Sequence, residues 1–355
     1  MGLTWEQPRE NSVDALCYGI NHFDGVEFDL RLSTDGVLML HHDNVTPNDD
    51  YIELLSSNEL KPFSDKFDDL LAKSEFTTPW QEHGKTVCIE LKSPHPSSGV
   101  GGGWKGGSKR IEYISSMIKM VDDAISQFEL PEGTTVLYSF DKKFLPAVKA
   151  AGWQHPKARL MPTLREWGSG NLQRAIAAPS FIAHSLPRLM RKHQKWGAPM
   201  IPCTLDYLHG MNRHLTLGTS VSLTGKGLEK LTKARKGFPA FVWPVRVPHE
   251  KLILDAGLTA LTDDSSPEIT HLPDGSPRIT RPASEPLFDG QHVPWHEMTN
   301  DSRKEFLSAQ RNRWQWSRSV DQLMAATSEN QIPWEVPRII GHRGAGKTKF
   351  CEMTG

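Results

Sequence analysis

The feature that most constrains the fold is the alternation of short apolar runs with longer amphipathic stretches along most of the chain. The short runs are bounded by turn residues, which is typical of repeated βα units whose strands pair in parallel. A single α/β barrel uses most of a chain of 355 residues. We therefore expect an α/β fold with a parallel sheet.

Nine runs are candidate strands, and they share high apolar content and flanking turn residues. They are GVEFDLRL (25–32), VLMLH (37–41), TVCIEL (86–91), TTVLY (134–138), RLMP (159–162), FIAH (181–184), FVWPV (241–245), LTALT (258–262) and RIIG (338–341).

Between the strands, apolar residues at helical spacing predict a helix over residues 109–128. Residues 93–108 are rich in Gly, Ser and Pro, and we expect a mobile loop there. A capping box, in which Ser302 precedes Glu305 by three positions, predicts a helix over about 302–324.

Charge and composition narrow the function classes. Lys and Arg number 41 against 42 Asp and Glu, a net charge of -1, so no strong field attracts nucleic acid. The four cysteines form no Cys-x-x-Cys pair, and the first residues lack an apolar core, which argues against secretion. No apolar run approaches the roughly 20 residues of a membrane helix. We expect a soluble, cytoplasmic protein without an integral membrane segment.

Two carboxylates share one candidate strand. Glu27 and Asp29 stand two positions apart in GVEFDLRL, and because strand side chains alternate between faces, both point the same way. Adjacent carboxylates repel each other, and a hard divalent cation relieves that repulsion. The pair is a candidate metal site, with solvated strand-end acids as the alternative.

Two further strand ends carry polar groups. His42 follows the run VLMLH, and Glu90 and Lys92 stand two apart in TVCIELK. Taken alone, a satisfied turn and a plain ion pair explain these residues. However, the carboxyl ends of parallel strands meet at one edge, where barrel active sites assemble, so we expect them to lie beside the acidic pair.

Several motifs follow one another along the chain: PRENSVDAL (8–16), VEFDLRLSTDG, LMLHHD and IELK, then YSFD, FVWPV and LTALTDDSSPE. In this order they resemble the glycerophosphodiester phosphodiesterase family, a (β/α)8 barrel of the phospholipase C type. Pro244 stands where that family usually has Thr. The resemblance covers residues 8–267 and is weak over 45–80 and 142–237.

The family's first strand ends in H-R-G-A and precedes the P-E-N motif, but here that strand resembles RIIGHRGAG near the other end of the chain. The resemblance therefore implies a circularly permuted (β/α)8 TIM barrel. A crossover through 268–337, with the helix at about 302–324, would place RIIG between GVEFDL and LTALT. The alternatives are a terminal strand with an incidental basic loop and a gene-boundary artefact.

GHRGAGKT also fits the phosphate-loop pattern G-x-x-x-x-G-K-[ST]. Such a loop needs a following helix to direct its N–H groups at the phosphates. Only seven residues, 349–355, follow Thr348. We therefore prefer the relocated strand to a nucleotide site.

The resemblance implies a site for a phosphodiester with a divalent cation. By resemblance, Glu27, Asp29 and Glu90 bind the cation, and three carboxylates without a thiol favour Mg²⁺ or Ca²⁺. Trp243 and Phe140, with Trp104 as a further candidate, would line the alcohol pocket; core packing is the alternative.

The same resemblance places His342 and His42 on either side of the phosphate as general acid and base. Which histidine plays which part stays open. Arg343 and Lys92 would stabilise the negative charge on the phosphate oxygens. His41 should face away from the site, and His184 is at most a residue of its mouth.

We therefore predict one phosphodiesterase barrel over 1–355, composed of 8–267, a connector at 268–337 and a relocated strand at 338–346. The substrate would be a small-molecule glycerophosphodiester, such as glycerophosphocholine or a lysophospholipid. The protein would be a monomer or a strand-swapped dimer. A phospholipase D-like or phosphoinositide-type lyase and a non-catalytic phosphate-binding barrel are the alternatives.

Overall fold

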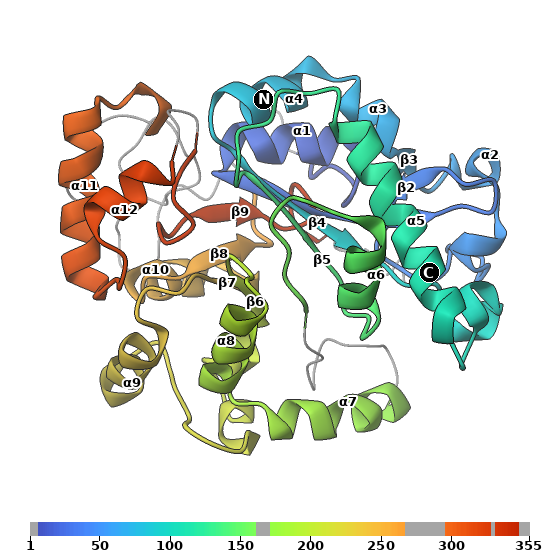
Figure 1. Cartoon of the computed structure of the whole chain (residues 1–355). Coiled ribbons are helices and arrows are strands. Elements are labelled where there is room, and N and C mark those ends of the chain that lie inside the picture. Colours follow the sequence, from blue (N-terminus) through green and yellow to red (C-terminus); the bar gives the residue numbers. More distant parts are fainter. Residues whose placement is uncertain (1–5, 161–170, 267–294, 328–330, 348–355) are drawn as a thin grey trace.

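A nine-stranded sheet lies at the centre of the computed structural model, which describes residues 6–160, 171–266, 295–327 and 331–347 (Figure 1). The strands are β1 (Gly25–Leu32), β2 (Leu38–Leu40), β3 (Asp65–Lys66), β4 (Thr86–Leu91), β5 (Thr135–Tyr138), β6 (Ile201–Thr204), β7 (Ala240–Val245), β8 (Thr259–Thr262) and β9 (Ile339–Gly341).

Seven strands pair in parallel in the spatial order β5, β4, β1, β9, β8, β7, β6. β2 pairs antiparallel with β1, and β3 pairs antiparallel with β2. The predicted α/β fold with a parallel sheet is confirmed.

Helices surround this sheet (Figure 1). They are α1 (Val13–His22), α2 (Ser57–Leu60), α3 (Phe67–Leu71), α4 (Ser74–Glu82), α5 (Gly107–Ile125), α6 (Phe144–Ala151), α7 (Asn171–Ala183), α8 (Leu186–Lys195), α9 (Gly225–Arg235), α10 (Val247–Asp255), α11 (Asn300–Trp314) and α12 (Val320–Ala325). No helix in the described ranges is both long and apolar enough to cross a membrane.

Both faces of the parallel strands are buried, which is why their sequences are nearly continuous apolar runs. One face packs on the residues of neighbouring strands, including Val136, Phe241 and Ile340. The other packs beneath helices, as Val26 and Phe28 do in the cluster that contains α1 and α5 residues. Charged residues on the first face are therefore held in a largely buried environment.

β9 occupies the position between β8 and β1 that the sequence predicts for RIIG. Its residues pair with β8 at Ala260↔Ile339, Leu261↔Ile340 and Thr262↔Gly341, and with β1 at Val26↔Gly341. The following turn packs closely on α1: a Cβ added at Gly344 would lie 2.5 Å from backbone atoms of Ala15. Gly344 has φ +84°, a conformation that glycine adopts without strain.

Three of the predicted strands differ in the structure. The run 37–41 becomes the short antiparallel strand β2. Residues 181–184 are not a strand, because 181–183 complete helix α7; a short apolar run does not by itself distinguish a strand from a buried helix turn. Residues 161 and 162 lie outside the described residues, although Leu160 N–H donates to the Ser139 carbonyl in a strand-like manner.

Two strands were not predicted at all. β3 has only two residues. β6 has only four, and Pro202 within it weakens the strand signal in the sequence. It nevertheless pairs in parallel with β7 from Ile201 to Thr204.

The predicted helix over 109–128 is α5, whereas the predicted helix over 302–324 is two helices. α11 begins after Thr299, whose hydroxyl accepts from Ser302 N–H, so the predicted Ser302 cap is wrong. Gln315, at φ +53°, ends α11 before α12 begins.

The Gly-rich segment 93–108 is structured rather than open. It contains two short 3₁₀ helices, η2 (Pro96–Ser98) and η3 (Val100–Gly102). The buried Arg110 side chain donates to the Pro94 and Gly103 carbonyls. The sequence expectation of a mobile loop overlooked this anchoring cation.

Candidate active site

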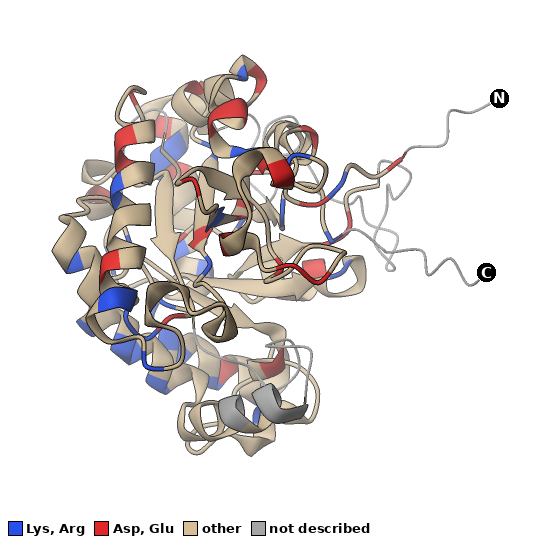
Figure 2. Cartoon of the chain, turned by 90° about the vertical axis from the view of Figure 1, so that its right-hand side faces the viewer, with Lys and Arg blue, Asp and Glu red and all other residues tan. Residues whose placement is uncertain are grey.

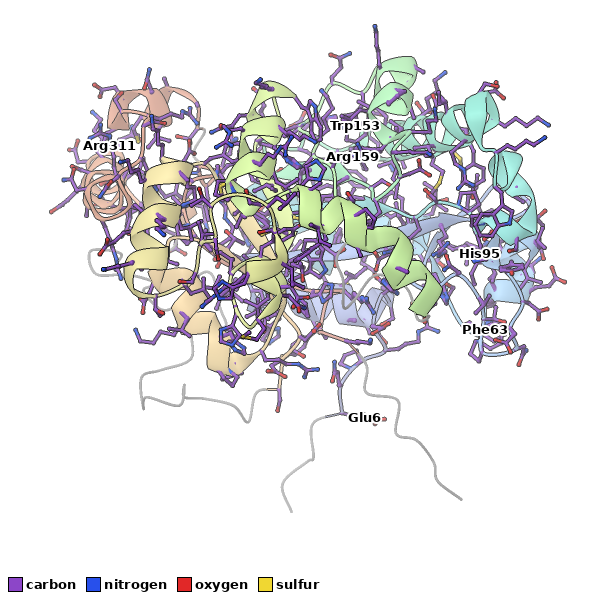
Figure 3. The ribbon with its side chains drawn as sticks, turned by 90° about the horizontal axis from the view of Figure 1, so that it is seen from below. Glu6, Phe63, His95, Trp153, Arg159 and Arg311 are labelled. Atoms are coloured by element: carbon purple, nitrogen blue, oxygen red, sulfur yellow. The ribbon has the colours of Figure 1, made fainter. Side chains whose placement is uncertain are left out.

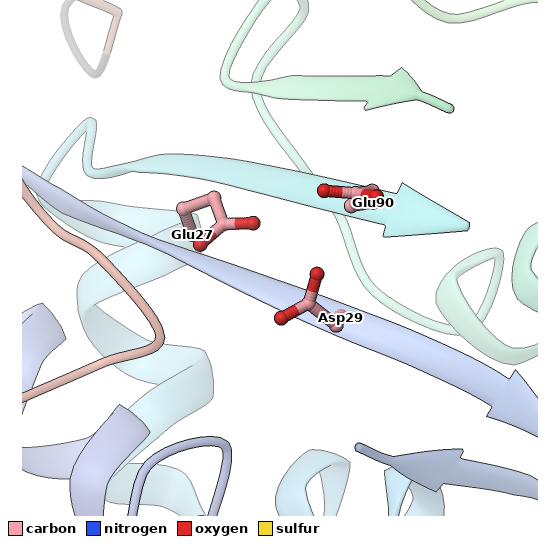
Figure 4. Close-up of side chains that lie close together, drawn as sticks. All are labelled: Glu27, Asp29 and Glu90. Atoms are coloured by element: carbon pink, nitrogen blue, oxygen red, sulfur yellow. The ribbon is translucent and has the colours of Figure 1, made fainter. Parts of the chain in front are cut away.

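Three carboxylates from two adjacent strands form the centre of the site (Figure 4). Glu27 and Asp29 project from the same face of β1, and Glu90 lies opposite Asp29 in the register with β4. One oxygen from each lies within 4.8 Å of the others, and all three side chains are buried. The structure thus brings the predicted metal ligands together.

The protonation of this cluster reflects its crowding. Burial, then the neighbouring Asp29, raises the pKa of Glu27 to about 7. Burial also raises the pKa of Glu90 to about 8, against the opposing effect of Lys92. For Asp29 burial acts in the same direction, but Lys92, Arg343 and the Asn11 amide together lower its pKa.

The donor set fits a hard divalent cation. Carboxylate oxygens are the ligands that Mg²⁺ and Ca²⁺ take, and a cation among them would favour the ionised form that burial now disfavours. No other group of three such residues suited to a metal occurs in the described part of the chain.

Lys92 lies beside two of the carboxylates. Its Nζ is 2.9 Å from Asp29 Oδ1 and 2.7 Å from Glu90 Oε1. The ammonium therefore offsets part of the negative charge, and it would stand next to any phosphate that reaches the cluster.

The segment after β9 brings His342 and Arg343 to the same cluster. His342 Nδ1 is 2.7 Å from Asp263 Oδ1, and its Nε2 is 3.7 Å from Glu27 Oε2. Burial alone would lower the pKa of His342, but Asp263 and Glu27 raise it overall. The Arg343 N–H donates to Glu27 Oε2 at 3.1 Å.

Two residues ahead of α1 hold this segment in place. Asn11 donates to Asp29 Oδ2 and accepts from Asp29 N–H, while its own N–H donates to the Arg343 carbonyl. Glu10 accepts from Arg343 Nη1 at 2.8 Å. Both Asn11 and Arg343 have positive φ, at 52° and 53°, and such sparsely populated conformations cluster at functional sites.

His42 lies at the end of the β2 segment. Its Nδ1 is 2.8 Å from Asp43 Oδ1, and 31% of its side chain is exposed. Partial burial, followed by the positive charges of Lys92 and Arg343, lowers its pKa well below the ordinary value.

The buried Arg31 side chain fixes the backbone beside His42. Its Nε and Nη2 donate to the His42 carbonyl at 3.2 and 2.9 Å, and Nη1 donates to the Ser93 carbonyl. This guanidinium therefore ties the His42 segment to the segment that follows Lys92. His41 lies apart, with Nδ1 3.2 Å from Ser64 Oγ.

Phe140 and Trp243 contact each other next to the cluster. Their ring centroids are 6.1 Å apart at an interplanar angle of 73°, and Lys92 Nζ lies 5.9 Å from the Phe140 centroid. Trp104, by contrast, is 75% exposed, and His184 follows a helix rather than a strand.

Figure 2 shows where acidic and basic residues lie on the side of the molecule at the right of Figure 1.

Sequence reasoning did not assign roles to Glu10, Asn11, Asp263 or Arg31. The first three stand inside motifs that the sequence analysis quotes, PREN and LTDD, so their positions were visible although their contacts were not. Arg31 follows the E-x-D pair by two positions on the same face, which is the available signal for it.

Residues 2–151 match the model of the glycerophosphoryl diester phosphodiesterase family. The matched segment contains the three carboxylates, Lys92 and His42, and it excludes His342 and Arg343. No curated protein sequence matches the chain.

Solved structures of that type are similar to the chain at low identity. A phosphodiesterase from Oleispira antarctica in complex with the product sn-glycerol-3-phosphate is 13% identical, with a TM-score of 0.45, over 72% of this chain and 88% of that one. A glycerophosphodiester phosphodiesterase from Parabacteroides distasonis is 15% identical, with a TM-score of 0.43, over 73% and 88%.

The glycerophosphodiester phosphodiesterase from Thermotoga maritima is 16% identical, with a TM-score of 0.39, over 66% of this chain and 79% of that one. Similarities this distant carry no assignment by themselves. The family match over the segment that holds the carboxylates supports a phosphodiester hydrolase.

Proposed function

We propose that the protein hydrolyses a glycerophosphodiester to glycerol 3-phosphate and an alcohol, with the help of a divalent cation. One observation carries this proposal: His342 and Arg343 join a buried cluster of three carboxylates that belongs to the family-matched segment. Carboxylates that can hold a metal cation, together with basic side chains and histidines at one edge of a parallel sheet, suit a negatively charged diester.

Glu27, Asp29 and Glu90 would hold the cation, and Mg²⁺ or Ca²⁺ suits three oxygen donors. When bound, such a cation neutralises charge that develops on the phosphate oxygens. The remaining steps fall to the side chains of this chain.

Arg343 and Lys92 would bind the phosphate. The Arg343 Nε makes no hydrogen bond to any described residue, and its planar guanidinium can grip two oxygens. Lys92 supplies a second positive charge on the side of Glu90. Together they would strengthen their hold as the phosphate gains charge.

His42 and His342 would transfer the protons. Hydrolysis requires that a proton leave the attacking oxygen and that another reach the leaving alcohol. Asp263 accepts from His342 Nδ1–H, which leaves Nε2 facing the carboxylate cluster. Asp263 is thus a positioning residue, and one histidine would act as base while the other acts as acid.

Phe140 and Trp243 would contact the alcohol part of the substrate, since they lie on the Lys92 side of the site. A choline or lysophospholipid alcohol suits such aromatic walls. The head group is best found by comparing glycerophosphocholine with lysophospholipids as substrates.

We also propose that the sheet is a closed, circularly permuted (β/α)8 barrel formed by one domain over 1–355. The position of β9 between β8 and β1 supports it, because a barrel brings its first and last strands together. The parallel bridge between Lys157 and Leu137 gives β5 a second parallel neighbour besides β4. The cytoplasmic location stays a prediction from sequence.

The test is release of glycerol 3-phosphate from glycerophosphocholine by purified protein, with and without a chelator. We expect chelator-sensitive activity. A cyclic phosphate that accumulates without hydrolysis would replace the hydrolase with a lyase, and no turnover of any diester would leave a phosphate-binding protein.

Mixing two inactive variants tests whether the site belongs to one chain. His42→Ala and His342→Ala chains, unfolded and refolded together, should stay inactive if β9 docks within its own chain. Recovery of up to about a quarter of the activity would instead indicate a strand-swapped dimer, in which half-sites from two chains combine.

A further inference from the structure

A second group of basic side chains lies where residues 157–160 meet α7 and α8. Ala158 and Leu160 are buried in the same cluster as Val136 and Phe241, so Arg159 between them points to the opposite, outer face. The His193 Nε2, on α8, lies 2.7 Å from the Arg159 carbonyl and fixes this approach. Figure 3 labels Arg159 in the view from below.

Two more basic residues complete the group, which we call the outer basic cluster: Arg159, His184 and Lys192. The Lys192 Nζ lies 2.6 Å from His184 Nε2. The His184 Nδ1 lies 2.6 Å from the Ser180 carbonyl and must donate to it. His184 Nε2 is therefore a lone-pair acceptor for the ammonium, and the other two N–H groups of Lys192 stay available.

The cluster has positive charge, and no described acid lies in contact with it. In the described ranges, none of its three members has a carboxylate within ion-pair distance, and the buried Arg159 Nε has no hydrogen-bond partner. The acid that acts electrostatically on Arg159 is Asp141. Asp141 is already engaged by Ser93 Oγ, the Lys143 N–H and Arg110.

We propose that the outer basic cluster binds a phosphate group, with Arg188 at its edge. Oxygens of one phosphate would accept from the Arg159 guanidinium and from the Lys192 ammonium, and both bonds would be charge-assisted. Arg188 is exposed and donates to the Ala183 carbonyl at 3.0 Å, beside His184. The phosphate would come either from a free phosphorylated solute or from a lipid head group.

The electrostatics of the three side chains favour an anion as the ligand. Burial lowers the pKa of Arg159, and burial followed by neighbouring cations lowers the pKa of Lys192. The pKa of His184 is lowered by burial as well, with Lys192, Arg188 and Arg159 acting in the same direction. A bound anion would reverse each of these effects because it stabilises the charged forms.

This site is independent of the proposed function, since it lies on the outer face of the sheet and shares no residue with the carboxylate cluster. Binding is best measured by calorimetric titration of the full chain with inorganic phosphate at constant ionic strength. The protein would carry Lys92→Met to weaken phosphate binding at the carboxylate cluster, and any heat that remains from that cluster is common to all the variants compared.

In this background we expect saturable binding that Lys192→Gln and Arg159→Gln each weaken by about tenfold or more, the usual effect of losing a charge-assisted hydrogen bond. Lys195→Gln is the matched control, because Lys195 is exposed on the same helix and has no described contact with the cluster. Equal binding by all variants, or heat that does not saturate, would overturn the proposal.

Cosedimentation with vesicles distinguishes the two phosphate sources. Vesicles that contain phosphatidic acid in phosphatidylcholine should retain the chain only if the lipid head group reaches the cluster. Retention lost with Lys192→Gln but kept with Lys195→Gln would support the site and assign it to lipid. Saturable binding of free phosphate without such retention would support the site and assign it to a solute.

Discussion

The two regions that build the candidate active site differ in how the chain holds them. β1 and β4 pair along six consecutive positions and carry the three carboxylates inside the family-matched segment. β9 pairs with β8 at three positions and with β1 at one, and it brings His342 and Arg343 from outside that segment. The acidic half is set by the register of β1 and β4, whereas the half that supplies His342 and Arg343 depends on long-range docking.

The contacts of the second half confirm this dependence. Asp24 Oδ2 accepts from Ile339 N–H, and Glu27 Oε2 accepts from Arg343 N–H. Backbone groups of the β9 segment therefore donate to one carboxylate just before β1 and to one within it. A change in either strand therefore reaches the other. The difference predicts which variants lower the catalytic rate and which weaken the packing between the two regions.

The largest effect should come from the two histidines, one in each region. If both transfer protons, His42→Ala and His342→Ala should each lower kcat by about 10²- to 10⁴-fold, with folding preserved. Steady-state kinetics and thermal melts measure this. A His342→Ala enzyme with nearly full activity would confine the chemistry to the family-matched region. His41→Ala, which removes the neighbouring ring that contacts Ser64, is the control.

Asp263→Asn should lower kcat by about 10- to 100-fold, because the carboxylate that orients His342 is lost. Asp263 also raises the pKa of His342, so its removal should move one limb of the pH–rate profile to lower pH. Asp264→Asn is the matched comparison, since Asp264 contacts Arg246 and the Val247 N–H instead. An unmoved profile in Asp263→Asn would leave Asp263 with a purely structural part.

Gly344→Ala should weaken the joint between the regions. The added Cβ would meet the Ala15 backbone, and φ +84° is strained for alanine, so we expect a loss of about 2 kcal/mol or more in unfolding free energy. Gly36→Ala has a similar φ of +77° with nothing within 4 Å and should lose only about 1 kcal/mol. Similar losses measured by denaturant unfolding would mean that the close approach to α1 has no energetic consequence.

A smaller effect concerns the acidic half alone. The pKa values of Glu27 and Glu90 are raised from 4.5 to about 7 and about 8. The metal-free folded state thus binds protons more tightly than the unfolded state, and these groups make stability fall as the pH rises from about 5 to about 8.

A divalent cation favours the ionised carboxylates, so it should raise the melting temperature by a few degrees more at about pH 8 than at about pH 5.5. Melting curves with Mg²⁺, Ca²⁺ or chelator measure this difference. In Glu90→Gln the cation-dependent difference should shrink. A cation effect independent of pH would place the ion elsewhere.

The sequence predicted the strands that have long apolar runs and the site residues that lie at their ends. GVEFDLRL and TVCIEL are strands as predicted, because seven buried residues in the first and six in the second leave little alternative. β6 escaped prediction because four residues with a central proline give almost no signal. FIAH was misread because its apolar run finishes a helix.

Contacts between distant segments were beyond the sequence. The motif order placed RIIG beside β1, but nothing in the sequence showed that Asn11 bonds both Asp29 and the Arg343 carbonyl. These bonds depend on two residues with positive φ, and local propensity disfavours that conformation for Arg. The roles of His42, His342, Arg343, Lys92, Trp243 and Phe140 stay predictions.

The central position of β9 has a consequence for the order of assembly. β1 and β8 are joined through β9, so the described sheet consists of two halves, one around β1, β4 and β5 and the other of β6, β7 and β8. Each half pairs strands that are close in the sequence compared with β1 and β9. The contact between β9 and the start of β1 joins residues more than 300 positions apart, as in the bond from Ile339 N–H to Asp24. Pairing over such separations is slow.

A chain that has folded only the two halves would already present its three carboxylates, yet it would lack His342 and Arg343. Docking of β9 would then be the step that completes both the sheet and the proposed pair of proton-transfer histidines. The recovery of turnover during refolding would therefore report when this last long-range contact forms, and an incompletely folded chain would be inactive.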